Sequence, residues 1–414
     1  MIERADFGKY VESSPWNLFG AALILTLVLG TGCTVFEAQE KSHAPPTEQS
    51  QSAKPGSEQG SSASSPQAQE DVSEKIFAEI LSEQITFDSL GDTLVGVLDR
   101  PETRQTPGPA VLILHATGPH DRRGHFKTGL GIQLPVEVPV YENIAQNLAR
   151  NGYLVMRYDK RTCVKGGRAW CTYPRSYVES QRQNLAQALE ADASAALARL
   201  QSNPRVDPAQ IYILGHDQGA DLALAIAEKA QPAGLILLAP SPYPVDQIIA
   251  HQIDGSLKHL NKARETAGNT SDGALLDQQI AELIRTKERQ AQDFAALRAG
   301  TFDADDLLGA PANTWSGFLQ LHQRASAQLA RHTTPTLAIF GSHDRVLPRE
   351  SARAFREGAR GAGGEDALLV EIVELAQITH FMVDIDPQAS PSAVSERVQE
   401  QVLDFLEAQS KAGH

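Results

Sequence analysis

The sequence predicts an α/β fold in which a mostly parallel central sheet is flanked by helices and carries a helical insertion. Three observations support this prediction. Short apolar runs alternate with helical patterns from residue 84 onward, and the alternation stops between residues 240 and 334 before it resumes. A turn with the sequence GHDQG, at residues 215–219, joins a β-branched run to an alanine-rich helical pattern. Such alternation is typical of parallel strands joined by helices that cover the sheet.

The individual elements follow from the same patterns, taken in chain order. Two short runs, separated by Gly91-Asp92, predict a hairpin of strands 84–88 and 93–99 at the start of the fold. Later strands are expected at 110–115, 153–158, 211–214, 234–239, 335–340 and 368–374, and helices at 141–151, 184–201, 349–360 and 391–408. In the interval between residues 240 and 334, apolar residues recur at helical spacing among polar ones, which predicts the helical insertion.

The composition fits one large catalytic domain with additional segments. The chain has 414 residues, of which 41% are hydrophobic, and a net charge of -14. An acidic surface repels the phosphate backbone of nucleic acids, and the sequence contains no basic run that would offset this repulsion. We therefore expect no nucleic-acid partner.

The N-terminal 33 residues have the pattern of an export signal. Residues 18–32 are uncharged and end in small residues before Cys33, and the run is too short for a typical membrane span. This ending resembles the processing site of bacterial lipoproteins, which implies a lipidated Cys33 and anchoring to a membrane of the bacterial cell envelope. Leu29 lies one place too far upstream and the leader contains three acidic residues, so an uncleaved N-terminal membrane anchor stays open.

Two further features agree with export. Residues 34–75 are rich in Ser, Gln, Ala, Pro, Gly and Glu, and such a composition predicts a flexible linker that cannot bury enough apolar surface to fold. Cys163 and Cys171 lie in one predicted loop, close enough to form a disulfide in an oxidising compartment. The alternative is a pair of free loop thiols.

Three residues that carry chemistry recur in a characteristic order. Asp217 lies at the centre of the 215–219 turn, where the flanking glycines leave room for backbone that a Cβ would block. Asp344 follows the 335–340 strand, and His380 follows the last strand. The order nucleophile, acid, histidine on this strand pattern resembles that of the α/β-hydrolases, and the turn resembles their nucleophile elbow.

The segment HATGPHDR, at residues 115–122, extends this resemblance. It is similar to the HGSGPxDR segment of bacterial esterase-like α/β-hydrolases related to serine aminopeptidases. The resemblance implies a core of residues 76–240 and 335–414 and a helical cap at 241–334. It also implies an oxyanion hole formed by the backbone N–H of Gln218 and one near Ala116 or Thr117, with His380 as general base oriented by Asp344. In this chain Ala116 replaces the usual glycine, and Asp217 the usual serine.

Three interpretations of Asp217 stay open. In the first, Asp217 is a nucleophile, as in the haloalkane dehalogenases and epoxide hydrolases of the superfamily. In the second, His380 and Asp344 activate a water for direct attack on an ester, and Asp217 positions that water or the imidazolium. In the third, the site is catalytically silent and the protein is a binding lipoprotein.

The remaining candidates concern the substrate. Arg122, Tyr243 and Trp315 are candidate substrate contacts, although an ion pair of Arg122 with Asp121 or Asp159 is an alternative. The sequence has no cluster with metal-ligand spacing and no phosphate-binding glycine loop, so we expect neither metal nor cofactor. The expected partner is a small or medium neutral molecule, ester-like or alkyl.

Overall fold

The computed structural model describes residues 79–126, 138–163, 171, 184–331, 333–360, 369–385 and 393–412. The predicted export signal, Cys33 and the 34–75 linker lie outside these residues. Within the described part of the chain, no helix is both long enough and apolar enough to cross a membrane.

An eight-stranded sheet forms the centre of the described structure, with strand order β1-β2-β6-β3-β7-β8-β11-β12. β1 pairs antiparallel with β2, and β2 antiparallel with β6, whereas the pairs from β6 to β12 are parallel. The strands are β1 Ile80–Ser89, β2 Asp92–Pro101, β3 Gly108–Leu114, β6 Leu154–Tyr158, β7 Val206–His216, β8 Gly234–Leu238, β11 Thr336–Gly341 and β12 Val370–Leu375. The predicted fold class, including the N-terminal hairpin, is therefore confirmed.

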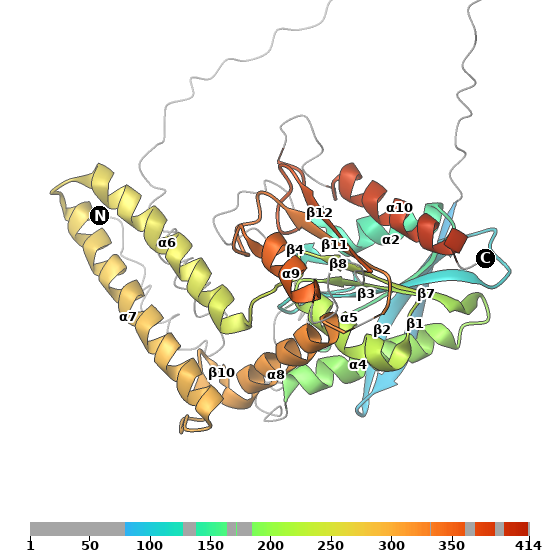
Figure 1. Cartoon of the computed structure of the whole chain (residues 1–414), viewed down its shortest axis with the longest axis horizontal. Coiled ribbons are helices and arrows are strands. Elements are labelled where there is room, and N and C mark those ends of the chain that lie inside the picture. The colour runs from blue at the N-terminus through green and yellow to red at the C-terminus, as the bar shows by residue number, and fades with distance from the viewer. Residues whose placement is uncertain are drawn as a thin grey trace, which may run out of the picture.

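Helices cover both faces of this sheet (Figure 1). One face carries α2 (Val140–Arg150) and α10 (Glu396–Ala412), and the other carries α4 (Leu185–Gln201), α5 (Gln218–Ala230) and α8 (Ala312–Leu329). Helix α9 (Ser351–Arg360) packs on α8 and β12. Because both faces are covered, every residue of β6, β8 and β11 is buried, as expected for the central strands of a parallel sheet.

The insertion follows β8 and consists mainly of helices. Helices α6 (Val245–Ala267) and α7 (Ser271–Ala299) pack against each other and extend from the body of the molecule at the left of Figure 1. Their contact is apolar and includes Ile253, Leu260 and Leu283. Helix α8 returns the chain to the sheet and packs on α4 and α5. Two short ladders lie outside the predicted elements: β4 (His125–Phe126) with β5 (Val138–Pro139), and β9 (Asp306–Leu307) with β10 (Ala310–Pro311).

Candidate active site

The turn between β7 and α5 has the geometry of a nucleophile elbow. Asp217 adopts φ 52° and ψ -114°, a conformation that L residues rarely adopt, and its N–H donates to the carbonyl of Leu238 at 2.9 Å. A Cβ on Gly215 would lie 2.2 Å from the carbonyl oxygen of Gly219, and a Cβ on Gly219 would lie 2.3 Å from that of Leu114. Glycine is therefore required at both positions, which explains the sequence pattern.

The Gly219→Ala variant is expected to be less stable than the parent by about 2 kcal/mol, because the added methyl group must displace the backbone of β3. Gly255→Ala is the matched control, since a Cβ there meets nothing within 4 Å and Gly255 lies inside α6. That control is expected to gain up to about 1 kcal/mol. Urea unfolding measures both changes, and equal stability of the two variants would contradict the steric argument.

Asp344 and His380 form the acid and histidine pair predicted from the sequence. Nδ1 of His380 lies 2.7 Å from Oδ2 of Asp344, and the other carboxylate oxygen, Oδ1, accepts the N–H groups of Val346 and Leu347 at 2.8 and 2.9 Å. Burial lowers the pKa of His380, but the Asp344 carboxylate and, to a smaller extent, Asp217 raise it above its usual 6.5. The buried imidazole is thus oriented and made more basic.

The carboxylate of Asp217 accepts a hydrogen bond from the protein backbone. The N–H of Thr117 donates to Oδ2 of Asp217 at 3.0 Å. Burial raises the pKa of Asp217, but the positive charge of His380 and the hydrogen bond from Thr117 outweigh this effect and bring the pKa below its usual value. Asp217 is therefore an anion at neutral pH, and its Oδ2 holds the N–H of Thr117.

Of the two residues expected to supply the second donor, the N–H of Thr117 faces Asp217 and that of Ala116 does not. The N–H of Ala116 donates at 2.8 Å to Oη of Tyr141, which is fully buried, so this N–H is engaged away from Asp217. The Tyr141 hydroxyl lies 3.3 Å from Nδ1 of His216, and Nε2 of His216 lies 2.9 Å from the carbonyl of His380. These contacts tie the loop after β3 to the histidine loop.

Gln218 is the first residue of α5, so its N–H has no acceptor within the helix and lies at the positive end of the helix dipole. Its side chain has a partner that the sequence analysis missed: Nζ of Lys160 donates to Oε1 of Gln218 at 2.9 Å and to the carbonyl of Ala116 at 2.8 Å. Burial lowers the pKa of Lys160 to about 7. A lysine two residues past the end of β6 could have been identified, because polar residues at this edge of a parallel sheet often form sites.

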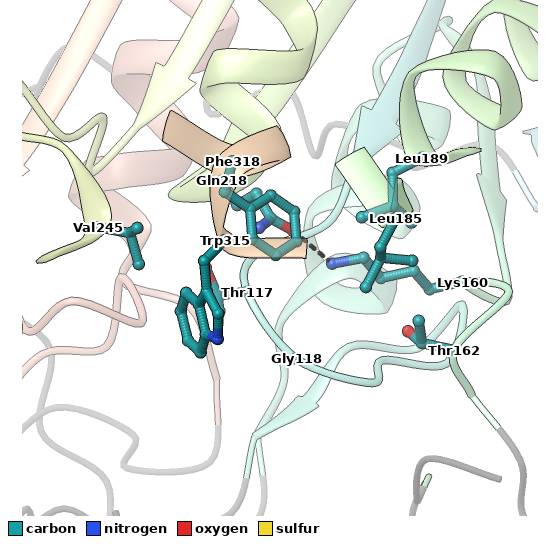
Figure 2. A pocket seen from close by; sticks show the side chains of 10 residues that line it. All are labelled: Thr117, Gly118, Lys160, Thr162, Leu185, Leu189, Gln218, Val245, Trp315 and Phe318. Atoms are coloured by element: carbon teal, nitrogen blue, oxygen red, sulfur yellow. Dashed lines mark hydrogen bonds between the residues drawn. The ribbon is translucent and has the colours of Figure 1, made fainter. Parts of the chain in front are cut away.

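A cavity of about 40 Å³ lies beside these residues. Figure 2 shows Trp315 and Phe318 of α8 across from Leu185, Leu189 and Lys160. Its lining residues are Thr117, Gly118, Lys160, Thr162, Leu185, Leu189, Gln218, Val245, Trp315 and Phe318. The insertion thus contributes to the site through Val245, at the start of α6, and through α8.

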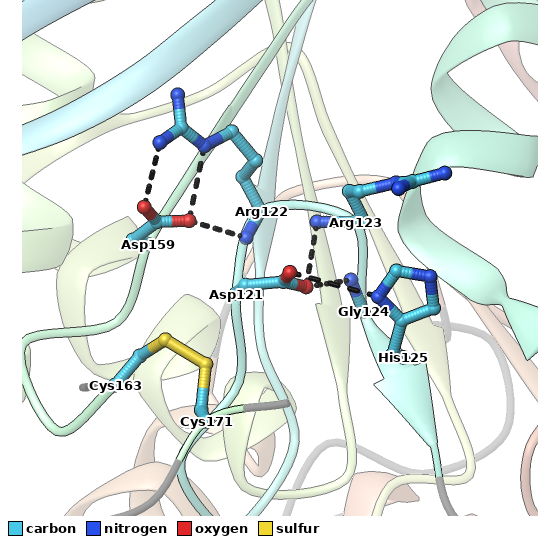
Figure 3. The surroundings of a disulfide bond; sticks show 8 residues. All are labelled: Asp121, Arg122, Arg123, Gly124, His125, Asp159, Cys163 and Cys171. Atoms are coloured by element: carbon cyan, nitrogen blue, oxygen red, sulfur yellow. Dashed lines mark hydrogen bonds and ion pairs between the residues drawn. A yellow bond between two sulfur atoms is a disulfide. The ribbon is translucent and has the colours of Figure 1, made fainter. Parts of the chain in front are cut away.

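The candidate substrate contacts lie in different places. Trp315 lines the cavity, while its Nε1 donates to the carbonyl of Leu307 at 2.6 Å. Arg122 forms an ion pair with Asp159 through two hydrogen bonds, at 3.0 and 2.7 Å (Figure 3). It is not among the residues that line the cavity. Tyr243 lies near charged residues of the α9 region and is not among the cavity residues either.

The loop beside Arg122 contains the predicted disulfide. Cys163 and Cys171 are bonded, with their Cα atoms 4.7 Å apart, and lie close to the Asp159 ion pair in Figure 3. As for metals, the described residues contain no group of three or more His, Cys, Asp or Glu side chains that could hold an ion.

A family model described as serine aminopeptidase, S33, matches residues 137–370, which is more than half of the chain. The chain belongs to this family. The serine aminopeptidase assignment agrees with the resemblance of residues 115–122, although the family is named for a serine and the elbow here is centred on Asp217.

One curated relative and several solved structures are also similar. Esterase EstD of Thermotoga maritima is 26% identical over 286 residues, which is 69% of this chain and 57% of the relative, so the chain spans little more than half of that protein. Est1E from Butyrivibrio proteoclasticus is 16% identical with a TM-score of 0.43, covering 78% of this chain and 99% of its own. An acylaminoacyl peptidase from Pyrococcus horikoshii is 14% identical with a TM-score of 0.48, covering 80% and 42%.

Proposed function

We propose that this protein is a cofactor-independent hydrolase in which Asp217 attacks an alkyl carbon that bears a leaving group. The observation that carries the proposal is the hydrogen bond from the N–H of Thr117 to Oδ2 of Asp217. It leaves Oδ1 to act as nucleophile and places Oδ2 where negative charge develops when the resulting ester is hydrolysed. The family assignment and the esterase named EstD support hydrolysis in general.

The two steps of this reaction use the residues already described. In the first, Oδ1 of Asp217 bonds to the substrate carbon, and the carbon's bond to the leaving group breaks with its electron pair on that group. In the second, His380 takes a proton from water, and the hydroxide adds to the Asp217 carboxyl carbon. Negative charge then forms on Oδ2, which the N–H groups of Thr117 and Gln218 stabilise. Collapse releases the alcohol, which receives the proton from His380 and carries the former Oδ1. Asp217 is left as a carboxylic acid and loses its proton to solvent, which restores the carboxylate.

An ordinary ester suits this site poorly. Attack of a carboxylate on an acyl carbon gives a tetrahedral intermediate that expels the weakly basic carboxylate before the alkoxide. Direct attack of water on an ester is also disfavoured, because the Asp217 anion occupies the Thr117 donor and opposes negative charge on the substrate. The alkyl interpretation avoids both problems.

The His380→Gln variant is expected to accumulate a covalent ester on Asp217 during incubation with an epoxide or a bromoalkane, because the base for the second step is missing. Intact-protein mass spectrometry would show the addition, and peptide mapping would place it on Asp217. His259→Gln, which removes an exposed histidine of α6, is the matched control and should accumulate none.

Two other outcomes would decide against the proposal. Turnover of aryl esters by the parent, with no adduct in His380→Gln, would favour direct attack by water. Absence of both turnover and adduct would favour a silent site in a binding protein, which the occupied Thr117 donor also permits.

We also propose that the protein is exported and anchored through a lipidated Cys33. The signal-like N-terminus and the Cys163–Cys171 disulfide, which suits an oxidising compartment, support this location. In a bacterial host, the Cys33→Ala variant is expected to lose labelling by a palmitate analogue and to move from the membrane fraction to the soluble fraction. Continued membrane attachment of an unlabelled Cys33→Ala protein would instead indicate an uncleaved N-terminal anchor.

A further inference from the structure

Lys160 is a buried cation whose hydrogen-bond acceptors are both neutral. Its side chain is almost fully buried, and Nζ contacts only the carbonyl oxygen of Ala116 and the amide oxygen of Gln218 among the described residues. An ammonium carries three N–H donors, so one donor is left over, and Lys160 lines the cavity beside Asp217. A buried cation without an anionic hydrogen-bond partner is costly, and burial accordingly lowers the pKa of Lys160 to about 7.

Thr162 supplies a second unused donor to the same cavity. Its side chain is 1% exposed, and Oγ1 has no hydrogen-bond partner in the described part of the chain. A buried hydroxyl without a partner is unusual in native structures and often indicates a missing ligand or water. Thr162 lines the cavity together with Lys160 (Figure 2).

The charged groups around Lys160 leave its charge only partly compensated. Asp192 raises the pKa of Lys160 from a distance, but this carboxylate is paired with Arg161. Asp217 also raises the pKa of Lys160, but its carboxylate is hydrogen-bonded to Thr117 and lies close to the positive charge of His380. Burial lowers the pKa of the nearby His120 to about 3, so this side chain is neutral. A further anion in the cavity would therefore be attracted by Lys160 more directly than by any other group.

We propose that this cavity is a carboxylate subsite, in which Lys160 is the counter-ion and the Thr162 hydroxyl donates the second hydrogen bond. A carboxylate has two acceptor oxygens, which match two donors on separate side chains. The inference rests on the proposed function, for which it names the substrate class: a small alkyl substrate that carries a carboxylate. It replaces the neutral substrate expected from the sequence.

The walls of the cavity fit the rest of such a substrate. Leu185, Leu189 and Phe318 are apolar residues of its lining, from α4 and α8. A volume of about 40 Å³ limits the ligand to a small molecule. The acid group would thus bind beside Lys160 while its chain packs against α4 and α8.

Calorimetric titration of the full chain with butyrate tests the subsite without any need for turnover. Butyrate is expected to bind at least tenfold more tightly than butyramide or chloride at equal ionic strength. Lys160→Met is expected to weaken butyrate binding at least tenfold, whereas Lys258→Met, which removes an exposed lysine of α6, should have no effect. At pH 8, titrations in buffers of different ionisation enthalpy should reveal proton uptake in the parent, because the anion favours the charged form of Lys160, and none in Lys160→Met.

The butyrate titrations test the subsite independently of catalysis. If Lys160→Met does not fold, as circular dichroism would show, the shape-conserving Thr162→Val variant replaces it and should bind butyrate severalfold more weakly. Equal binding of butyrate and butyramide, retained binding in the folded variants, or no butyrate binding by the parent would overturn the subsite. An adduct on Asp217 without butyrate binding rejects the subsite and keeps the proposed function. Butyrate binding without an adduct on Asp217 keeps the anion-binding subsite and rejects the proposed function.

Discussion

Replacing Asp217 by serine is expected to give the protein an aryl-esterase activity at least about a hundredfold above that of the parent. In the parent, the N–H of Thr117 donates to the Asp217 carboxylate. The substitution frees this N–H and removes the anion that opposes an oxyanion beside it. One such donor contributes on the order of a hundredfold or more in rate. His380, held by Asp344 at 2.7 Å, is then the base for the new hydroxyl group.

The assay is hydrolysis of short aryl esters by the parent, Asp217→Ser and Asp217→Ser/His380→Ala. The double variant is the control and should lose the gained activity, because the serine then lacks its base. The same Asp217→Ser protein should lose the alkyl adduct chemistry of the parent. An Asp217→Ser variant that folds but gains no esterase activity would show that the Thr117 and Gln218 donors do not form a working oxyanion hole.

Most of the fold could be predicted because its signals are local. The central strands are short apolar runs, and the two glycines of the elbow are required by contacts within 2.3 Å that any residue with a Cβ would violate. Asp344 and His380 could be assigned because each directly follows a strand at the same edge of the sheet.

The details of the site could not be predicted because they depend on orientation across segments far apart in the chain. Tyr141, 25 positions after Ala116, accepts the hydrogen bond of the Ala116 N–H. This contact decides that the N–H of Thr117, and not that of Ala116, faces Asp217. Lys160 reaches the elbow from β6, 58 positions away from Gln218. Neither contact leaves a periodic pattern in the sequence.

A second large effect is expected on stability, at the ion pair between Asp99 on β2 and Arg157 on β6. Nε of Arg157 lies 2.7 Å from Oδ2 of Asp99, and the Asp99 side chain is completely buried. In the Asp99→Ala variant the buried Arg157 guanidinium loses this partner and keeps Glu142, 3.7 Å from its Nη2, as a more distant anion. We expect the free energy of unfolding to fall by about 3 to 5 kcal/mol, measured by urea denaturation.

Two comparisons separate the cost of a buried charge that has lost its nearest partner from the value of the pair itself. Glu228→Ala breaks a pair with Arg331 at a similar 2.9 Å, but both side chains are more than half exposed, so the expected loss is less than about 1 kcal/mol. The double variant Asp99→Leu/Arg157→Met replaces both charges by apolar groups and should be more stable than Asp99→Ala, because it contains no buried guanidinium that has lost Asp99. If the double variant is no more stable than Asp99→Ala, the loss comes from packing between β2 and β6 and not from the guanidinium that has lost Asp99.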